Sequence, residues 1–571
     1  MDVFSNTFCA GGTQLGNGTW AVFGGNKPVT TGGVDAQDDG NVYRDTDGGT
    51  AIRMITPDDS GKVEYTQGAQ TFFVNQDTGG WLQMQSKRWY PSVETLGDGT
   101  SVVIGGDING GYVNTKYQDN PTYEFFPPNG EQVTLPFLSE TLPLNLYTLT
   151  WLMPSGKLFM QANRKSILYD LQTKETTNLP DMPYAARVYP ASGATAMLPL
   201  TPRNNYTPTI LFCGGSNNTN WGSDAGPGFN ITAYPADSSC VRIAPEGDAV
   251  YQDDDWMLEG RSMGEFVLMP DGNIWMGNGV AMGTAGYGDQ RYSVGTSYGQ
   301  DPLYTPAMYY PERPAGKRWD RTNFVASPNE RMYHSTAILL PDSSILIAGS
   351  NPNADFTNDQ WRSRTDIERW YPPYANEPRP AYTGMPESIS YGGDYFNITL
   401  NGSDVSAANN TRVVLHRNGF HTHALSFGQR MIELESTYTV DQNANTTTLH
   451  VSQIPGGATG PNLFQPGNAF FFVVVNGIPS IGEMVMVGNG QLGAQPTTDN
   501  AKLPTTSVIE KTPEPSKSEG SAAASPSETD AKNSAQGAID ASKKDNSGMA
   551  LTPMAGSMLG AAGLIVASLL M

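Results

Sequence analysis

The chain has 571 residues, which is enough for two or three domains with complete hydrophobic cores. Its formal net charge of −22 excludes a nucleic-acid partner, because binding to phosphates requires basic patches. Glycine and proline are abundant, and short aromatic and β-branched runs alternate with clusters of Gly, Asn, Asp and Pro. This composition predicts an all-β protein.

A hairpin pattern recurs along the first two thirds of the chain. Each copy has a hydrophobic strand, a tight turn containing Gly or Asp, a second hydrophobic strand and often a final Gly-Gly pair. The six copies cover residues 8–26, 89–107, 146–162, 188–216, 262–279 and 332–350. Repeats of this kind are typical of kelch-type propeller blades, so we predict a β-propeller over residues 1–375.

The composition changes after the last hairpin. A Pro-rich stretch at 371–386 marks a domain boundary, and alternating strands follow up to residue 490. We predict an immunoglobulin-like β-sandwich over residues 376–490. Residues 491–548 are rich in Ser, Thr, Pro and charged residues and poor in hydrophobic ones, which predicts a disordered stalk.

The chain ends on an apolar segment at 549–571. The small residues Asn546, Ser547 and Gly548 precede this segment and no charged residue follows it, which is the pattern of a GPI-attachment signal. The alternative is a C-terminal membrane span. A GPI signal requires an N-terminal signal peptide, and residues 1–4 do not form one. Either the chain lacks N-terminal sequence or the tail is not a GPI signal.

Sequons and cysteines point to an oxidising, extracellular setting. Eight Asn-X-Ser/Thr sequons predict a secreted, glycosylated protein at the cell surface or in the cell wall. They are at Asn17, Asn205, Asn217, Asn230, Asn397, Asn401, Asn409 and Asn445. Of the three cysteines, Cys213 and Cys240 follow one another in the chain and form the expected disulfide. Cys9 is left over, and an ordinary reading is a buried small hydrophobe.

Residues at equivalent places in different blades converge on the axis of a propeller. Tyr90, Tyr147, Tyr189 and Tyr333 share such a place, and Cys9 stands at nearly the same point in its own blade. The chain has five histidines: His334, His416, His421, His423 and His450. Imidazole and phenol donors together suit copper. Periodicity does not decide which tyrosines have a role, since an aromatic wedge between blades is the alternative for each.

Seven motifs in order make the resemblance specific. They are TFCAGG, RWYPSVETLGDG, NPTYEFFP, LPFL, RMYHSTAILLPD, GSNPN and THALSFGQR, and the match to which they belong runs from about residue 5 to residue 488. Together they resemble the fungal glyoxal oxidases of the galactose oxidase superfamily of copper-radical oxidases. The resemblance implies a seven-bladed propeller, of which this chain lacks the N-terminal part, and a sandwich that supplies a copper ligand.

The resemblance also implies roles for individual residues. Cys9 would be joined by a thioether bond to the ring of Tyr90, which would be both a copper ligand and the radical site. Tyr333 would be the axial ligand and the base for the substrate's hydroxyl proton. His334 and His423 would complete the ligands of one copper per chain. The Thr-His order of the motif selects His423 over His421, whose role stays open.

The implied reaction is the oxidation of small aldehydes, such as glyoxal, methylglyoxal and α-hydroxycarbonyls, to carboxylic acids. Dioxygen would be reduced to hydrogen peroxide, which peroxide-using enzymes would consume. We expect a monomer whose contact with a membrane is limited to the GPI anchor. Two alternatives are an oxidase of primary alcohols or sugars and a non-catalytic kelch propeller at the cell surface. The loops 107–125, 216–240 and 280–310 are expected to build the substrate pocket.

Overall fold

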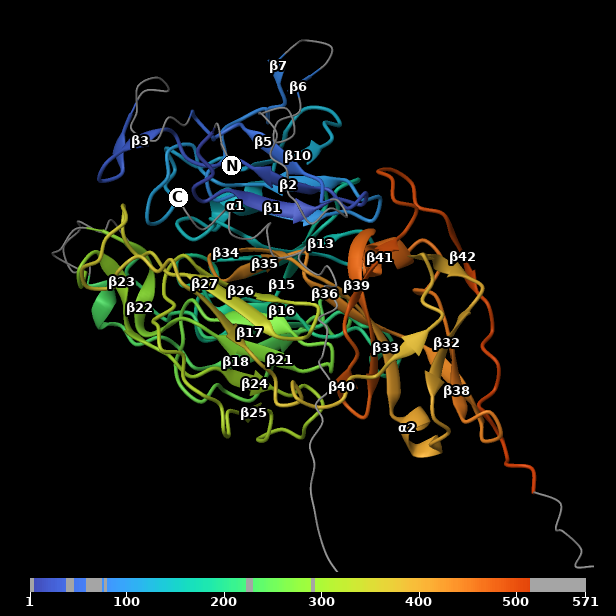
Figure 1. Cartoon of the computed structure of the whole chain (residues 1–571). Helices are drawn as coiled ribbons and strands as arrows, with labels where there is room; N and C mark the ends of the chain where they lie inside the picture. Colours follow the sequence, from blue (N-terminus) through green and yellow to red (C-terminus); the bar gives the residue numbers. More distant parts are fainter. Residues whose placement is uncertain are drawn as a thin grey trace, which may run out of the picture.

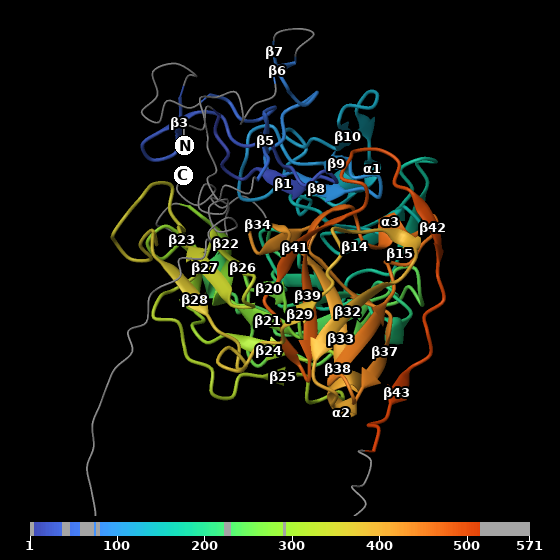
Figure 2. The same cartoon turned by 45° about the vertical axis from the view of Figure 1, so that its right-hand side comes forward.

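The computed structural model describes residues 5–36, 46–57, 74–75, 80–221, 230–288 and 293–513. These residues form an array of small antiparallel sheets followed by a two-sheet sandwich, and Figures 1 and 2 show the sandwich beside the array. The prediction of an all-β fold with a propeller-like domain and a following sandwich is confirmed. The α-helices of the described residues are short: α1 (Pro136–Glu140), α2 (Val405–Asn409) and α3 (Gly460–Leu463).

Six sheets of the described residues form the blades, and each is built from antiparallel strands in chain order, with a short hairpin inserted in the first and in the fifth blade. From the innermost strand outward, the first blade has β1 (Gly11–Gln14), β2 (Trp20–Phe23) and β5 (Ile52–Ile55), and the second has β8 (Ser92–Thr95), β9 (Ser101–Ile104), β10 (Thr122–Phe126) and β11 (Val133–Thr134). The third has β12 (Leu149–Leu152), β13 (Leu158–Ala162), β14 (Lys165–Tyr169) and β15 (Thr176–Leu179), and the fourth has β16 (Ala194–Met197), β17 (Ile210–Cys213), β18 (Cys240–Ile243) and β19 (Gln252–Asp253). The fifth has β20 (Glu265–Leu268), β21 (Ile274–Gly277), β24 (Ala307–Tyr309) and β25 (Trp319–Asp320), and the sixth has β26 (Ser335–Leu339), β27 (Ile345–Gly349) and β28 (Ile367–Trp370).

The innermost strands lie against one another. Strand β8 contacts both β1 and β12, and β20 contacts both β16 and β26. The seventh blade that the resemblance implies has no sheet among the described residues. Short hairpins decorate the blades: β3 (Val29–Thr30) with β4 (Val34–Asp35), β6 (Val74–Asn75) with β7 (Gly80–Trp81), and β22 (Val280–Tyr287) with β23 (Ser297–Pro302).

A left-handed residue stands just before the innermost strand of every one of the six blades. These residues are Cys9 (φ 58°), Tyr90 (59°), Tyr147 (49°), Ser192 (47°), Met263 (60°) and His334 (62°). Such φ values are uncommon for residues with a side chain and are held by the surrounding contacts. Several of the turns are joined by backbone hydrogen bonds of 2.7–3.0 Å, from Tyr90 N to Cys9 O, from Tyr147 N to Tyr90 O and from Met263 N to Ser192 O.

This alignment corrects the expected repeat. Tyr189 and Tyr333 do not occupy the turn position of Tyr90 and Tyr147, because in their blades that position belongs to Ser192 and His334. Tyr333 is one residue early, and Tyr189 is three residues early. The left-handed turn thus falls on Ser192 and His334 in these two blades, while Tyr189 and Tyr333 stand two residues after a buried arginine, as Tyr90 does, and all four tyrosines remain buried near the axis.

Buried arginines hold the ends of the inner hairpins. Arg88 donates through Nη1 to the carbonyl of Gly105 at 2.9 Å, and Arg331 donates to that of Gly349 at 2.7 Å. Arg187 and Arg261 donate in the same way to Gly214 and Asn278. Each of these arginines stands two residues before a tyrosine or methionine of the axis, so a recurring Arg-X-Tyr or Arg-X-Met is a sequence signal for this clamp.

The sandwich packs two sheets around Val413, Leu415, Leu449, Phe471 and Val473. One sheet has the order β29 (Tyr382–Thr383), β32 (Phe396–Asn401), β38 (Thr446–Val451), β37 (Ser436–Asp441), β43 (Ser507–Ile509). The other has the order β30 (Ser388–Ile389), β41 (Glu483–Val487), β39 (Gly467–Val475), β33 (Thr411–Arg417), β36 (Arg430–Leu434), with β40 (Ile478–Pro479) beside β39.

The predicted disordered stalk begins too early. Within 491–513, strand β42 (Thr497–Asn500) pairs with β31 (Tyr391–Gly393), and β43 pairs in parallel with β37. The segment is poor in hydrophobic residues, but the edges of existing sheets offer it unpaired backbone N–H and C=O groups. Sparse hydrophobicity therefore does not imply disorder here. The rest of the predicted stalk and the apolar segment 549–571 lie outside the described residues.

Two further features concern covalent and membrane structure. Cys213 at the end of β17 and Cys240 at the start of β18 form a disulfide, while Cys9 is a buried free thiol. Across the part of the chain that the structure describes, no helix has both the length and the apolar character to cross a membrane.

Candidate metal centre

A hairpin of the sandwich domain enters the centre of the propeller. It consists of β34 (Phe420–Thr422) and β35 (Leu425–Phe427). Strand β34 contacts the innermost strands β1 and β26, and β35 contacts β8 and β16. In Figures 1 and 2 this orange hairpin lies between the blue sheets of the first blades and the green and yellow sheets of the later ones. Two segments more than 400 residues apart in sequence therefore meet at the axis.

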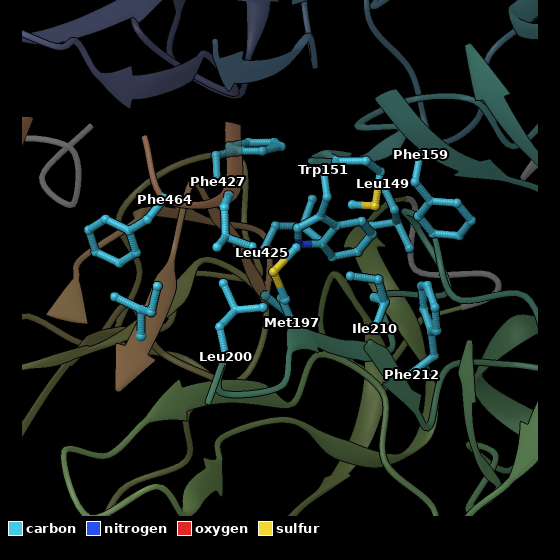
Figure 3. Close-up of a cluster of buried hydrophobic side chains, with 14 of the residues drawn as sticks. Leu149, Trp151, Phe159, Met197, Leu200, Ile210, Phe212, Leu425, Phe427 and Phe464 are labelled. Atoms are coloured by element: carbon cyan, nitrogen blue, oxygen red, sulfur yellow. The ribbon is translucent and has the colours of Figure 1, made fainter. Parts of the chain in front are cut away.

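Hydrophobic contacts fix the hairpin there. Leu425 and Phe427 of β35 belong to the largest buried cluster, together with Met197 and Leu200 of the fourth blade. Figure 3 shows Leu425 close to Met197, with Trp151 of the third blade beside them. Burying large side chains of this kind contributes roughly 1.5–3 kcal/mol each, so the hairpin is held by packing as well as by its backbone.

The turn of this hairpin carries His423. Thr422 pairs with Leu425, and the two residues between them have φ values of 52° (His423) and 64° (Ala424). Two successive left-handed residues define a type I′ turn, which normally favours Asn-Gly. The sequence His-Ala gives no such signal, and the tight turn is therefore visible only in the structure. It places the imidazole of His423 at the tip of the hairpin.

Four side chains meet in front of this tip. The Nε2 atom of His423 is 3.4 Å from the sulfur of Cys9 and 3.1 Å from the hydroxyl oxygen of Tyr333. The ligating atoms of Cys9, His334 and His423 all lie within 4.8 Å of one another. The ring of Tyr90 lies 5.7 Å from that of His423, so the fifth predicted residue is part of the same cluster.

Hydrogen bonds orient both imidazoles toward this cluster. Nδ1 of His334 is 3.0 Å from the carbonyl oxygen of Asn351, and because a carbonyl only accepts, Nδ1 carries the proton. The Nε2 atom of His334 is buried and has no hydrogen-bond partner among the described residues. Nδ1 of His423 is 2.6 Å from the Thr422 hydroxyl, which explains the Thr-His pair in the sequence motif. Histidine binds metals through an unprotonated ring nitrogen without a hydrogen-bond partner, while a hydrogen bond at the other nitrogen fixes the ring.

Burial sets the protonation states of the cluster. It lowers the pKa of His334 to about 4 and that of His423 well below its usual value. Both imidazoles are thus neutral at neutral pH and can donate lone pairs. Burial also raises the pKa of the Cys9 thiol to about 12 and those of Tyr90 and Tyr333 well above their usual range. Without a nearby positive charge these groups stay protonated.

The cluster fits a copper ion. Two neutral imidazoles and two phenol oxygens form a nitrogen and oxygen donor set of the kind that Cu(II) takes. The orphaned Nε2 of His334 is a buried polar atom that lacks a partner without such an ion. His334, His423, Tyr333 and Tyr90 would hold the ion.

Tyr147 and Tyr189 also line the cluster. The ring of Tyr147 lies 4.8 Å from that of His423, and its hydroxyl donates to the carbonyl of Ala10 at 3.1 Å, beside Cys9. The ring of Tyr189 lies 4.9 Å from that of Tyr90. Sequence periodicity suggested an aromatic wedge as the alternative for each tyrosine. The structure places these two in contact with the cluster itself.

His421 and His416 lie apart from the cluster. Nε2 of His421 is 3.2 Å from the Ser426 hydroxyl across the hairpin, and its Nδ1 is buried without a partner among the described residues. Burial lowers its pKa to about 3, with the nearby His416 as the second cause. The metal-type cluster contains His423 and not His421. His450 bonds Thr439 and Asn397 within the sandwich.

Aromatic side chains cover the cluster. Trp89 stacks on Tyr90 with ring centroids 5.3 Å apart, and Phe8 lies 5.1 Å from the ring of His334. Tyr287 packs against Tyr333 at 6.2 Å. Gly110 lies against the Trp89 ring. A Cβ atom at position 110 would be 1.5 Å from that ring, so only glycine leaves room for it. The site is therefore enclosed by a narrow apolar rim.

A cavity lies elsewhere on the propeller. It has a volume of about 850 Å³ and is lined by Val113–Thr115, Asn163, Arg164, Tyr184 and Ser216–Trp221, among others. Two of the predicted pocket loops, 107–125 and 216–240, contribute to it. None of the five clustered side chains lines it, so this cavity is distinct from the immediate surroundings of the cluster.

Comparison with known proteins agrees with this geometry. The sequence model of the glyoxal oxidase N-terminus matches residues 1–374, and that of the galactose oxidase-like Early set domain matches residues 379–487. The chain is 30% identical to the aldehyde oxidase GLOX of Vitis pseudoreticulata over 85% of this chain and 83% of the relative. It is 28% identical to the aldehyde oxidase GLOX1 of Arabidopsis thaliana over 71% and 65%, respectively.

A solved structure shows the same fold. It is a fungal alcohol oxidase of the AA5 family in complex with copper, and it superposes with a TM-score of 0.58 over 84% of this chain and 85% of that one, at 19% identity. Fold and cluster together define an oxidoreductase of the galactose oxidase-like, copper-radical class. Within that class, the chain belongs to the glyoxal oxidase family.

Proposed function

We propose that the chain is an extracellular copper-radical oxidase of small aldehydes. In the balanced reaction an aldehyde, water and O2 give a carboxylic acid and H2O2. The observation that carries the proposal is the convergence of Cys9, His334 and His423 within 4.8 Å, with Tyr333 and Tyr90 beside them. A non-catalytic propeller would have no use for these five polar groups, four of them buried, in one place.

The backbone hydrogen bond of 3.0 Å from Tyr90 N to Cys9 O supports a thioether cofactor between these two residues. Burial raises the pKa of the Cys9 thiol, and hydrogen bonds with Trp89 and Tyr90 offset part of that rise. Forming the bond between Sγ and a ring carbon removes the thiol hydrogen and one ring hydrogen, and the two electrons reduce O2 to H2O2. The sulfur donates electron density to the ring, which makes the phenol easier to oxidise to a radical.

The remaining residues divide the proton and electron transfers. A hydrated aldehyde loses two electrons and two protons to become an acid. Copper, when bound, supplies one-electron redox chemistry and lowers the pKa of coordinated phenols. Tyr333, as a phenolate, would take the proton of the substrate hydroxyl. Tyr90, once oxidised, would take a hydrogen atom from the substrate carbon, and His334 and His423 would hold the geometry through their Nε2 atoms.

The aromatic rim supports a small, uncharged substrate. Phe8, Trp89 and Tyr287 offer apolar ring faces around the cluster and no ionic group. A hydrated dialdehyde or α-hydroxycarbonyl needs few polar contacts beyond the reacting hydroxyl. A sugar needs several hydrogen-bonding partners along its length, and the rim residues provide few.

Several surface features support an extracellular location. Seven of the eight sequon asparagines are exposed and Asn17 is partly exposed, so the structure leaves each accessible for a glycan. The disulfide between Cys213 and Cys240 is typical of an oxidising compartment. We infer a glycosylated cell-surface or cell-wall protein, held by a GPI anchor through the segment 549–571, with peroxide-using enzymes as consumers of its product.

The test uses full-length protein carrying a secretion signal and loaded with copper. Intact mass should be two hydrogens below the value calculated from the sequence with its disulfide, and H2O2 should form with glyoxal and methylglyoxal. The Cys9→Ser variant should have the mass calculated from its sequence with the disulfide, without the two-hydrogen deficit. Its turnover should fall to background. Ser192→Ala, at the same turn position in the fourth blade, is the matched control and should retain the mass deficit. Active protein without the deficit would refute the thioether, and activity only with galactose would favour the sugar oxidase alternative.

A further inference from the structure

Tyr189 is a third buried phenol at the cluster, and the mechanism above does not use it. It is 2% exposed and lies in the linker before β16, three residues ahead of the turn residue Ser192. Its ring lies 5.6 Å from that of His423 and 6.3 Å from that of Tyr333. A polar hydroxyl buried this deeply requires a hydrogen-bond partner.

That partner is Tyr333. The two hydroxyl oxygens are 3.2 Å apart. The Tyr333 oxygen has a second neighbour, Nε2 of His423 at 3.1 Å. A metal ion bound by His423 takes the lone pair of that Nε2 atom. The hydroxyl of Tyr189 is then the hydrogen-bond donor that remains for the oxygen of Tyr333.

The ring of Tyr189 has a separate contact. It stacks on Tyr90 with a centroid distance of 4.9 Å and an interplanar angle of 24°. Trp89 also stacks on Tyr90, at 5.3 Å and 8°. Tyr90 therefore has two near-parallel aromatic neighbours, one from its own blade and one from the fourth blade. The hydroxyl and the ring of Tyr189 thus touch two different members of the cluster.

We propose that Tyr189 is a positioning residue that fixes the two tyrosines of the metal centre, holding the Tyr333 oxygen by a hydrogen bond and the Tyr90 ring by stacking. This inference rests on the proposed function. Hydrogen bonds to ionised groups are about twice as strong as neutral ones, so the bond to Tyr333 strengthens when that phenol binds copper as a phenolate. Loss of such an outer partner typically reduces metal affinity or activity 10–100-fold.

Two substitutions separate the contacts. Tyr189→Phe keeps the stacked ring and removes the hydroxyl, so it should weaken Cu(II) binding about 10–100-fold and shift the visible absorption of the copper-bound phenolate. It should still form the Cys9–Tyr90 bond when copper is in excess. Tyr189→Leu removes both contacts and should in addition lower the fraction of chains that show the two-hydrogen mass deficit.

Tyr123→Phe is the matched control. The hydroxyl of Tyr123 faces that of Tyr169 at 3.4 Å, and both side chains are buried in a different cluster of the propeller. This variant loses the same atom from a similar tyrosine pair, so it reports the general effect of the substitution on folding. We expect its copper affinity and absorption spectrum to equal those of the wild type.

The experiment measures the Kd for Cu(II) by competition with a chelator, the visible spectrum and the mass deficit in the full-length protein. A wild type that binds copper and forms the thioether, together with a Tyr189→Phe variant of unchanged Kd and spectrum, overturns the role of Tyr189 alone. A wild type with neither copper nor thioether overturns the proposed function and this inference together. Equal losses in Tyr189→Phe and Tyr123→Phe would also overturn it, because a general folding defect would explain them.

Discussion

The propeller and the sandwich build the same site by different means. The propeller supplies Cys9, Tyr90 and His334 from a turn that recurs before the innermost strand of each of the six blades. The sandwich supplies His423 from a single hairpin that has no counterpart in its own domain. Both use left-handed residues to aim side chains at the axis, but only the propeller repeats the arrangement. The repeated turn keeps its left-handed backbone although its residue differs from blade to blade. The single hairpin is positioned by its own contacts, such as those of Leu425 and Phe427.

The largest expected effect distinguishes two histidines within the hairpin. His423→Gln should reduce Cu(II) affinity by more than about 100-fold, beyond the loss expected for an outer partner, and peroxide release should fall to background. His421→Asn should change both quantities less than about threefold, because His421 bonds Ser426 away from the cluster. Copper content per chain and peroxide release measure the difference. Equal losses in the two variants would show that His423 is wrongly assigned as the copper ligand of the hairpin.

The second prediction concerns the link between the two domains. Arg430 of the sandwich donates to the carbonyl of Leu152 in the third blade at 2.6 Å and lies 3.5 Å from Glu94 in the second. Burial raises the pKa of Glu94 to about 7, and Arg430 opposes that rise. Arg430→Ala leaves this buried acid with less compensation and should cost about 3–5 kcal/mol of stability.

Arg412→Ala provides the comparison for that variant. Its nearest carboxylate, Glu433, is 3.8 Å away, and the side chain of Arg412 is partly exposed. We expect it to cost less than about 1 kcal/mol. Urea unfolding at neutral pH measures both. Similar midpoints for the two variants would mean that the hairpin is not anchored through Arg430.

The third prediction is a pH dependence at the base of the hairpin. Burial lowers the pKa of His416 to about 4, and both its ring nitrogens lack partners among the described residues. Between this value and the unfolded pKa of about 6.5, the unfolded chain binds more protons than the folded one. The contribution of His416 to stability is therefore complete above pH 6.5 and is lost as pH falls toward 4, by about 1.4 kcal/mol per pH unit.

His416→Phe tests this prediction. The variant should leave stability at pH 7 within about 1 kcal/mol of the wild type, because an apolar ring replaces an unsatisfied polar one. Between pH 6.5 and 4.5 the variant should lose less stability than the wild type, by about 1.4 kcal/mol for each pH unit. Unfolding midpoints at several pH values measure this, and an unchanged slope would assign the pH dependence to other groups.

The last prediction compares the two kinds of turn directly. Ala424→Gly should raise stability by up to about 1 kcal/mol, since glycine relieves a left-handed backbone at φ 64° at the expense of one methyl group. Met263→Gly relieves a similar φ of 60° but empties a buried site, and it should lower stability by about 2–5 kcal/mol. Thermal unfolding measures both. If Ala424→Gly lowered stability, the packing of the Ala424 methyl group would outweigh the relief of the left-handed backbone, as side-chain packing does in the propeller turns.

The repeat made much of the fold predictable. Hairpins with Gly- and Asp-containing turns signalled the blades, and the Pro-rich stretch near residue 375 signalled the change of domain. The strands at 497–509 were missed because they add to sheet edges through backbone hydrogen bonds, which composition does not report. The arginine clamps were also missed, although Arg88, Arg261 and Arg331 precede the axis residues at a constant spacing.

The sequence alone determined which residue types are available and where the hairpins lie, because strand periodicity and turn chemistry are local. It also carried the motifs that relate Cys9, Tyr90, Tyr333 and His334 to one family. The motif order already favoured His423 over His421, and the tertiary structure decided how that imidazole reaches the cluster and that Tyr147 and Tyr189 also touch it. Those outcomes depend on the left-handed turn at 423–424 and on contacts between segments more than 400 residues apart. Such contacts are set by the packing of two domains, and no local pattern of residues reports them.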